Sequence, residues 1–204
     1  MKKTPLIIIG VIVLLVVLAI GWYVGVRNNL VTLDEGVAQK WSQVEVQYQR
    51  RLDLIPNLVE TVKGYAAHES ETLESVTRAR AGLTDAYNAA RDIPDTAPAN
   101  QQALDAFNNS QSQLGRAFNV YVNAVREAYP DLKADSQFQD LQTQLEGTEN
   151  RIATERGRYT EAVREYNIRV RKFPASIVAS LSGFAVKPQF QADAAAATAP
   201  KVEF

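Results

Sequence analysis

The stretch from Leu6 to Val26 reads LIIIGVIVLLVVLAIGWYVGV, an unbroken run of uncharged and mostly aliphatic residues near the start of the chain. A helix rises ~1.5 Å per residue, so this run covers roughly the ~30 Å hydrocarbon core of a bilayer. It is longer and more apolar than the apolar part of a cleaved signal peptide, and no small-x-small cleavage site follows it. We therefore predict a transmembrane helix over residues 6–26, preceded by a short flank over residues 1–5.

The residues that flank this run predict its orientation. Trp22 and Tyr23, near the end of the run, have amphipathic rings that favour the membrane–water interface, so they mark one edge of the bilayer. The charges on either side of the run indicate its orientation. Lys2 and Lys3 precede the run, whereas Arg27 is followed by two acidic residues. By the positive-inside bias, we expect the N-terminus in the cytoplasm and the rest of the chain outside it.

Two glycines within the run, Gly21 and Gly25, are four residues apart. This spacing lets two transmembrane helices approach closely, which would give a homo-oligomer. Because glycine is common in transmembrane helices, the spacing fits an unpartnered helix better.

The composition excludes several classes of function. The chain has no cysteine and a single histidine, His68, so thiolate catalysis and cysteine metal sites are excluded. His68 lacks the spacing of a zinc motif, and no phosphate-binding or nucleophile-elbow motif occurs. A net charge of −1 gives no basic footprint for nucleic acid. We therefore expect no enzyme activity, cofactor, metal site or nucleic-acid partner.

Apolar residues recur every three or four positions in four later segments, which predicts helices and an all-α fold. These stripes run from Leu33 to Leu52, from Leu58 to Leu83, from Leu104 to Tyr129 and from Leu141 to Phe173. Short connections favour antiparallel neighbours, so we predict an up-and-down four-helix bundle over residues 27–173.

Prolines mark the expected breaks between these helices. Pro56 either ends one helix and begins the next, or only kinks a longer helix. Residues 91–100 include two prolines and are a predicted loop. Pro130 and Pro174 follow the third and fourth stripes.

Charge is unevenly divided along the last stripe. Residues 131–149 carry −4 and residues 151–172 carry +4. Complementarity to the helix dipole and ion pairs on a solvated face explain such a split. The alternative is that the basic end returns to the membrane and faces anionic headgroups. The candidates for that interface are Arg164, Arg169, Arg171 and Lys172, followed by a short apolar stretch over 175–184.

Residues 174–204 are expected to be this apolar stretch and a flexible tail. From Lys187 onward the chain is alanine-rich and lacks helix-length apolar patterning, so we expect it to be mobile. Its last six residues, APKVEF, are either a docking peptide or a solvated end.

Several short motifs accompany the helical pattern. WSQVEVQYQRR over residues 41–51 is followed by DLIPNLVETVKGY over 53–65 and AHE over 67–69. Further along are YPDLKA over 129–134, LEGTENRI over 145–152, and YN and FP at 166–167 and 173–174. Together they resemble the LemA family of bacterial membrane proteins over nearly the whole chain, with small departures at Thr160 and Gln189. The motif positions that carry the resemblance are Trp41, Arg50, Arg51, Asp53, Pro56, Asn57, Glu60, Tyr65, Tyr166, Asn167 and Pro174.

The resemblance implies a bromodomain-like bundle anchored in the bacterial inner membrane, with no established catalytic activity. It also implies roles in envelope stress, alongside membrane metalloproteases or TPM-domain proteins, or in intracellular membrane invagination. We therefore expect a scaffold or adaptor that recruits envelope proteins, and the alternative is a self-assembling protein that binds or shapes membrane lipid. Asp53 and Asn57 are expected to cap a helix junction rather than to form a partner surface.

Overall fold

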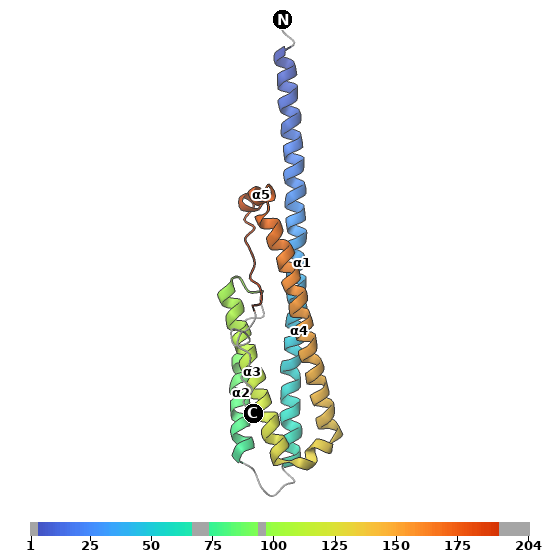
Figure 1. Ribbon diagram of the computed structural model, residues 1–204, viewed down its shortest axis with the longest axis vertical. Helices are drawn as coiled ribbons and strands as arrows, with labels where there is room; N and C mark the ends of the chain where they lie inside the picture. Colours follow the sequence, from blue (N-terminus) through green and yellow to red (C-terminus); the bar gives the residue numbers. More distant parts are fainter. Residues whose placement is uncertain (1–3, 67–73, 94–96, 192–204) are drawn as a thin grey trace, which may run out of the picture.

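One helix, α1 (Thr4–Ala66), includes the apolar run and continues without a break for 63 residues (Figure 1). The computed structural model describes residues 4–66, 74–93 and 97–191, and every regular element in these ranges is helical, which confirms the all-α prediction. Residues 7–22 are all exposed. Within the described ranges, α1 is the one helix long and apolar enough to cross a membrane, judged by length and composition.

The structure corrects the helix junction expected at Pro56. Because α1 runs through this proline, the longer helix is the right alternative, and Asp53 and Asn57 cap no helix end. Pro56 is exposed on the surface of α1. The stripe from Leu58 to Leu83 is divided between α1 and the next helix, and His68 lies outside the described residues.

Three further long helices lie beside the half of α1 that follows the apolar run (Figure 1). α1 packs mainly along α4, and α2 packs mainly along α3. Side-chain caps begin two of these helices: Asn100 and Asp135 each accept a hydrogen bond at 2.9 Å from a backbone N–H three residues later. The elements after α1 are α2 (Glu74–Arg91), α3 (Gln101–Ala128), the 3-10 helix η1 (Pro130–Ala134), α4 (Ser136–Arg171) and α5 (Ala175–Leu181).

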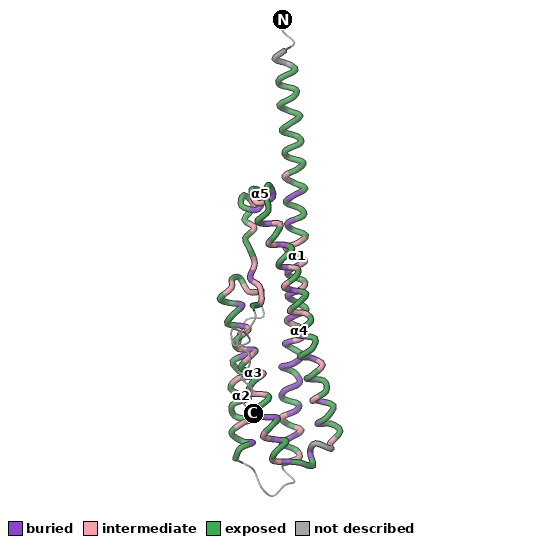
Figure 2. Tube along the Cα trace, viewed as in Figure 1, coloured by how far each residue is buried: buried purple, intermediate pink, exposed green. Residues whose placement is uncertain are grey.

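The core consists of two apolar clusters, one near the apolar run and one far from it. Figure 2 shows that the buried residues of α1 begin where the exposed run ends. The near cluster joins residues 26–48 of α1 to Phe107 of α3 and to the second half of α4. The far cluster joins residues 52–62 of α1 to α2, to the end of α3 and to the start of α4. Stripe positions such as Trp41 and Val44 are buried, as the helical period predicts.

The segment after α5 corrects the expectation of a mobile tail from Lys187. Residues 184–190 run back along α4 (Figure 1), and Asn167 holds them through both of its amide atoms. Its Nδ2 donates to the Lys187 carbonyl at 2.9 Å, and its Oδ1 accepts from the Lys187 N–H at 2.8 Å. The Lys187 ammonium lies 2.9 Å from a carboxylate oxygen of Asp34 on α1. Residues 192–204 lie outside the described part of the chain.

Candidate functional site

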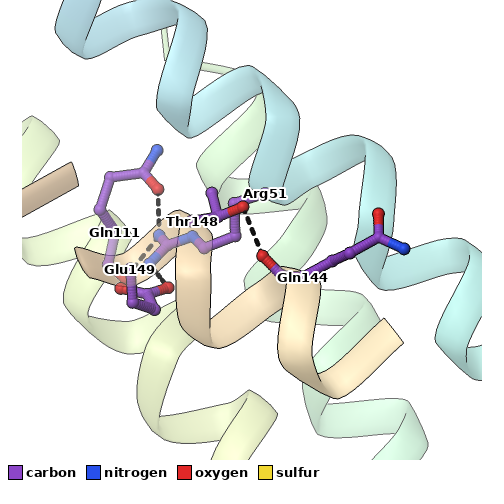
Figure 3. Close-up of polar contacts among 5 residues, drawn as sticks. All are labelled: Arg51, Gln111, Gln144, Thr148 and Glu149. Carbon is purple, nitrogen blue, oxygen red and sulfur yellow. Dashed lines mark hydrogen bonds and ion pairs between the residues drawn. The ribbon is translucent and has the colours of Figure 1, made fainter. Parts of the chain in front are cut away.

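A layer of buried polar side chains lies between the two clusters. Figure 3 shows the contacts within this layer. Arg51 of α1, Gln111 of α3 and Thr148 of α4 are each no more than 5% exposed. Arg51 Nη1 donates to Glu149 Oε1 at 2.9 Å, while Nη2 donates to the Gln111 carbonyl at 3.1 Å and to the Gln111 side chain. The Thr148 hydroxyl donates to the Gln144 carbonyl at 2.7 Å. The guanidinium of this polar layer therefore joins α1 to both α3 and α4.

A cleft of about 440 Å³ opens beside the polar layer. Its apolar lining includes Phe118 and Leu145, and Arg126 Nη2 donates to Gln142 Oε1 at 2.9 Å between α3 and α4. The charged residues in the lining are two arginines and two glutamates. Neither sign of charge therefore dominates the lining of this cleft.

A second, more open hollow lies between the last turns of α1 and the start of α4, at the end farthest from the apolar run. We call it the distal groove. Its charged lining residues are Glu60, Asp135 and Asp140, all acidic, and its apolar lining includes Leu132 and Leu141. The motif residues Asp53, Pro56, Asn57 and Glu60 are all exposed and are spaced so that they share one face of α1. The face that carries these residues therefore borders the groove.

The residues predicted to meet a membrane gather at the opposite end of the body. The Tyr23 hydroxyl lies 3.0 Å from Ser182 Oγ, just after α5, which places the end of α5 at the height of the last turns of the apolar run. Arg27, Arg171 and Lys172 are exposed there, and Arg169 is half-buried.

The other candidates for membrane contact differ in their location and in their ion pairs. Arg164 forms an ion pair with Glu161 at 2.8 Å, and Trp22 is 45% exposed on the apolar run. A Cβ added at Gly21 or Gly25 would meet nothing within 4 Å. Lys2 and Lys3 lie outside the described residues.

The remaining family-motif residues fall into three groups. Trp41, Tyr166 and Asn167 hold the near cluster and the segment after α5. Tyr65 packs edge-on against the Tyr129 ring at 5.9 Å, in the far cluster. Arg50 is exposed, in contrast with its neighbour Arg51, and Pro174 precedes α5 after a cis peptide bond.

Sequence reasoning did not single out Gln111, Thr148, Glu149 or Phe190 as site residues. Gln111 and Thr148 interrupt otherwise apolar stripes at positions that face the core, and such a lapse is a signal for a buried polar partner. The only sequence signal for Phe190 was that it is an aromatic residue in a tail that is otherwise polar and rich in alanine.

Burial raises the pKa of four tyrosines of the core, one of which is Tyr48. Burial raises the pKa of Tyr121, Tyr159 and Tyr166 from 10.0 to about 12, and the nearby Asp34 carboxylate adds to the effect on Tyr166. The Tyr159 hydroxyl donates to the Pro188 carbonyl at 3.2 Å, and the Tyr166 hydroxyl donates to the Ala185 carbonyl at 3.0 Å. Both hydroxyls therefore hold the segment after α5 only while they are protonated.

We expect the body to unfold in strong alkali. The folded-state pKa values lie above the unfolded value of 10.0, so this stability is complete below pH 10 and is lost as the pH rises toward 12. Each tyrosine that ionises only on unfolding lowers the free energy of unfolding by ~1.4 kcal/mol per pH unit in that window. Denaturant titrations at a series of pH values measure how steeply the free energy of unfolding falls with pH. This dependence should be weaker in Tyr159→Phe, which has one fewer ionisable hydroxyl. A constant free energy of unfolding across this window would contradict the prediction.

The fold and these sites define a class: an all-helical protein whose first helix has the length and composition of a membrane anchor and continues into the folded body. Residues 40–204 match the LemA family, and the chain belongs to that family. Among the described residues, no group of three or more His, Cys, Asp or Glu side chains is placed to hold a metal ion.

Relatives include magnetosome proteins. The chain is 30% identical over 178 residues to magnetosome protein MamQ 2 of Paramagnetospirillum magneticum, covering 80% of this chain and 64% of that protein. It is 28% identical over 173 residues to magnetosome protein MamQ of Magnetospirillum gryphiswaldense, covering 77% and 61%. It is 24% identical over 158 residues to protein LemA of Metamycoplasma hominis, covering 77% and 65%. The alignments thus span just under two thirds of the length of these relatives.

Proposed function

We propose that this chain is a non-enzymatic, membrane-anchored scaffold or adaptor of the bacterial cell envelope. The observation that carries the proposal is the continuity of α1, which joins the apolar run to the folded body as one helix. From Arg27 to Ala66 this helix extends about 60 Å at ~1.5 Å per residue. We interpret the body as an antiparallel, bromodomain-like four-helix bundle that presents a surface at a fixed height above the membrane.

The distal groove is the surface best suited to a protein partner. Apolar side chains line its floor, and its acidic rim includes the exposed Glu60 and Asp140, an arrangement typical of protein interfaces. Asp140, with the half-buried Asp135, favours a partner segment that carries lysine or arginine, because complementary charge steers association. Glu60 is already paired with the Lys63 ammonium at 3.2 Å. A membrane metalloprotease and a TPM-domain protein are the first partners to test, since the family resemblance implies them.

Site-specific photo-crosslinking in intact membranes tests this proposal. A photoreactive residue at Asn57, beside the groove, is expected to form an adduct with one defined second protein. The same residue at Val120, which is exposed on α3 and outside the groove lining, serves as the control. Asp140→Lys should reduce the Asn57 adduct, whereas Asp85→Lys makes the same charge change on α2 and should leave it unchanged. Equal adducts at both positions, or adducts only between copies of the chain, would overturn the proposal.

Self-association through the anchor is the second candidate function. It is supported by Gly21 and Gly25, which leave a face of the apolar run open to the close approach of another helix. In the crosslinking experiment, adducts between copies without a second protein would favour this candidate.

We further propose that the anchor lies in the inner membrane with the N-terminus in the cytoplasm. The basic flank before the run supports this orientation. The native chain has no cysteine, so a single exposed cysteine at Asn150 reports on one site without background. Its labelling by a membrane-impermeant thiol reagent in cells whose cytoplasmic membrane is intact is expected, and labelling only after lysis would reverse the topology.

A further inference from the structure

Helix α5 has its large apolar side chains on the outside. Phe173, Ile177 and Leu181 are 76%, 50% and 74% exposed. Ile177 and Leu181 are four residues apart within α5, so they share one face of this short helix. Phe173 is exposed in the turn just before the helix, and we call the three side chains together the α5 stripe. The smaller residues Ala175 and Ala179 are buried on the opposite side. Exposure of three large apolar side chains within nine residues is unfavourable in water, so we expect an apolar environment to cover them.

The position of α5 on α1 indicates what that covering is. The buried side of α5 packs in the near cluster with Val26 and Leu30, the first buried residues after the exposed run (Figure 2). Ser182, which follows α5, lies 3.0 Å from Tyr23, inside the run itself. Tyr23 is ~4.5 Å along the helix axis from Val26 at ~1.5 Å per residue. A bilayer that surrounds residues 6–26 therefore reaches the height of α5.

Charge around α5 agrees with this position. Arg27, Arg171 and Lys172 are exposed beside it, and among the described residues none of the three forms an ion pair. Basic side chains at the depth of the headgroups are attracted to anionic lipid phosphates. Arg164, lower on α4, instead uses its charge in the pair with Glu161.

We propose that α5 is a second membrane contact, which rests its Phe173–Ile177–Leu181 stripe in the interfacial layer of the leaflet from which α1 emerges. This inference rests on the proposed anchoring of α1 in a bilayer. A helix that crosses a membrane alone is free to tilt. Because α5 packs on both α1 and α4, its contact with lipid fixes the tilt of the whole body relative to the bilayer.

Depth-dependent fluorescence quenching tests this proposal on the full-length purified chain in lipid vesicles. Single cysteines at Ile177 and Leu181 are labelled with an environment-sensitive fluorophore, and the vesicles include lipids that carry a nitroxide quencher near the headgroup or on the acyl chain. The control site is Val120, which is 60% exposed on α3 and far from the apolar run. A further site at Val16, in the middle of the run, reports insertion of the anchor.

We expect both α5 probes to be quenched several-fold more strongly than the Val120 probe, and more strongly by the headgroup quencher than by the acyl-chain quencher. The Val16 probe should show the reverse depth preference. Quenching at Ile177 and Leu181 no stronger than at Val120, with Val16 quenched, would overturn the α5 contact and leave the anchor intact. Blue-shifted α5 probes that no lipid quencher reaches would show that a second copy of the chain covers the stripe, which also overturns the proposal. No partner protein is present, so failure of the distal groove as a docking surface has no bearing on this result.

Discussion

Replacing Arg51 by alanine is expected to lower the free energy of unfolding by ~3–5 kcal/mol. The substitution removes the one side chain that joins α1 to α3 and α4 in the polar layer. It leaves the buried Gln111 side chain without its charged donor, and an unpaired buried polar group alone costs ~1–3 kcal/mol. The rest of the loss comes from the space that the arginine side chain vacates, whose Nη1 lies 4.0 Å from the position that a Cβ at Gly115 would take.

The neighbouring arginine provides a matched control. Arg50 has the same charge in the same helix turn, but it is exposed, so Arg50→Ala should change the free energy of unfolding by less than ~0.5 kcal/mol. Urea denaturation of the full chain in detergent micelles, followed by circular dichroism, compares the two variants. Similar losses in both would show that Arg51 acts as a surface charge and not as the centre of a buried layer.

An apolar replacement of the layer separates stability from specificity. Arg51→Met combined with Gln111→Leu should recover most of the stability that Arg51→Ala loses, because well-packed apolar residues often substitute for a buried polar pair without cost. The ion-pair partner Glu149 is 52% exposed, so water can solvate the carboxylate that remains. Restored stability with a loss of fixed aromatic circular dichroism signals would show that the polar layer sets the register between α1, α3 and α4.

The apolar period was sufficient to predict which side of each helix is buried. Trp41, Val44 and Tyr48 lie on one stripe by spacing alone, and all three are in the core. Pro56 could not be decided in the same way. A proline inside a helix removes one hydrogen bond, and whether the helix continues depends on packing on both sides of it, here against α4. Local sequence contains no measure of that packing.

The candidate sites depended still more on contacts distant in the chain. Gln111 and Thr148 could be recognised as polar lapses in a core stripe, but their place in a layer with Arg51 depends on the relative height of three helices. The docked segment 184–190 has no period of its own, and its position is set by side chains on α4 such as Asn167. Composition therefore predicted mobility where tertiary hydrogen bonds give order.

Replacing Trp41 by alanine is the second substitution with a large expected effect, a loss of ~3–5 kcal/mol from the free energy of unfolding. Trp41 is 2% exposed and contacts three other aromatic rings in and around the near cluster. Its centroid lies 5.3 Å from the rings of both Phe107 and Tyr159, and 6.3 Å from the ring of Phe190. Removing it leaves a cavity bordered by α1, α3, α4 and the segment after α5.

The chain has one other tryptophan, which serves as the control. Trp22 is 45% exposed on the apolar run, so Trp22→Ala should leave the denaturation midpoint of the body unchanged in micelles. Equal effects of the two substitutions would contradict the assignment of Trp41 to the core.

A double-mutant cycle between Trp41 and Phe190 then tests whether the C-terminal segment belongs to that core. The two rings are stacked, with an interplanar angle of 20°, and the Arg156 guanidinium lies 4.3 Å from the Phe190 ring centroid. Trp41→Ala and Phe190→Ala together should therefore cost less than the sum of the single losses, by ~0.5–1.5 kcal/mol. Fully additive losses would mean that the segment lies on the body without sharing its core. A coupling of the expected size would mean instead that residues after α5 help to hold α1 against α4, and so connect the membrane-facing end of the protein to its folded body.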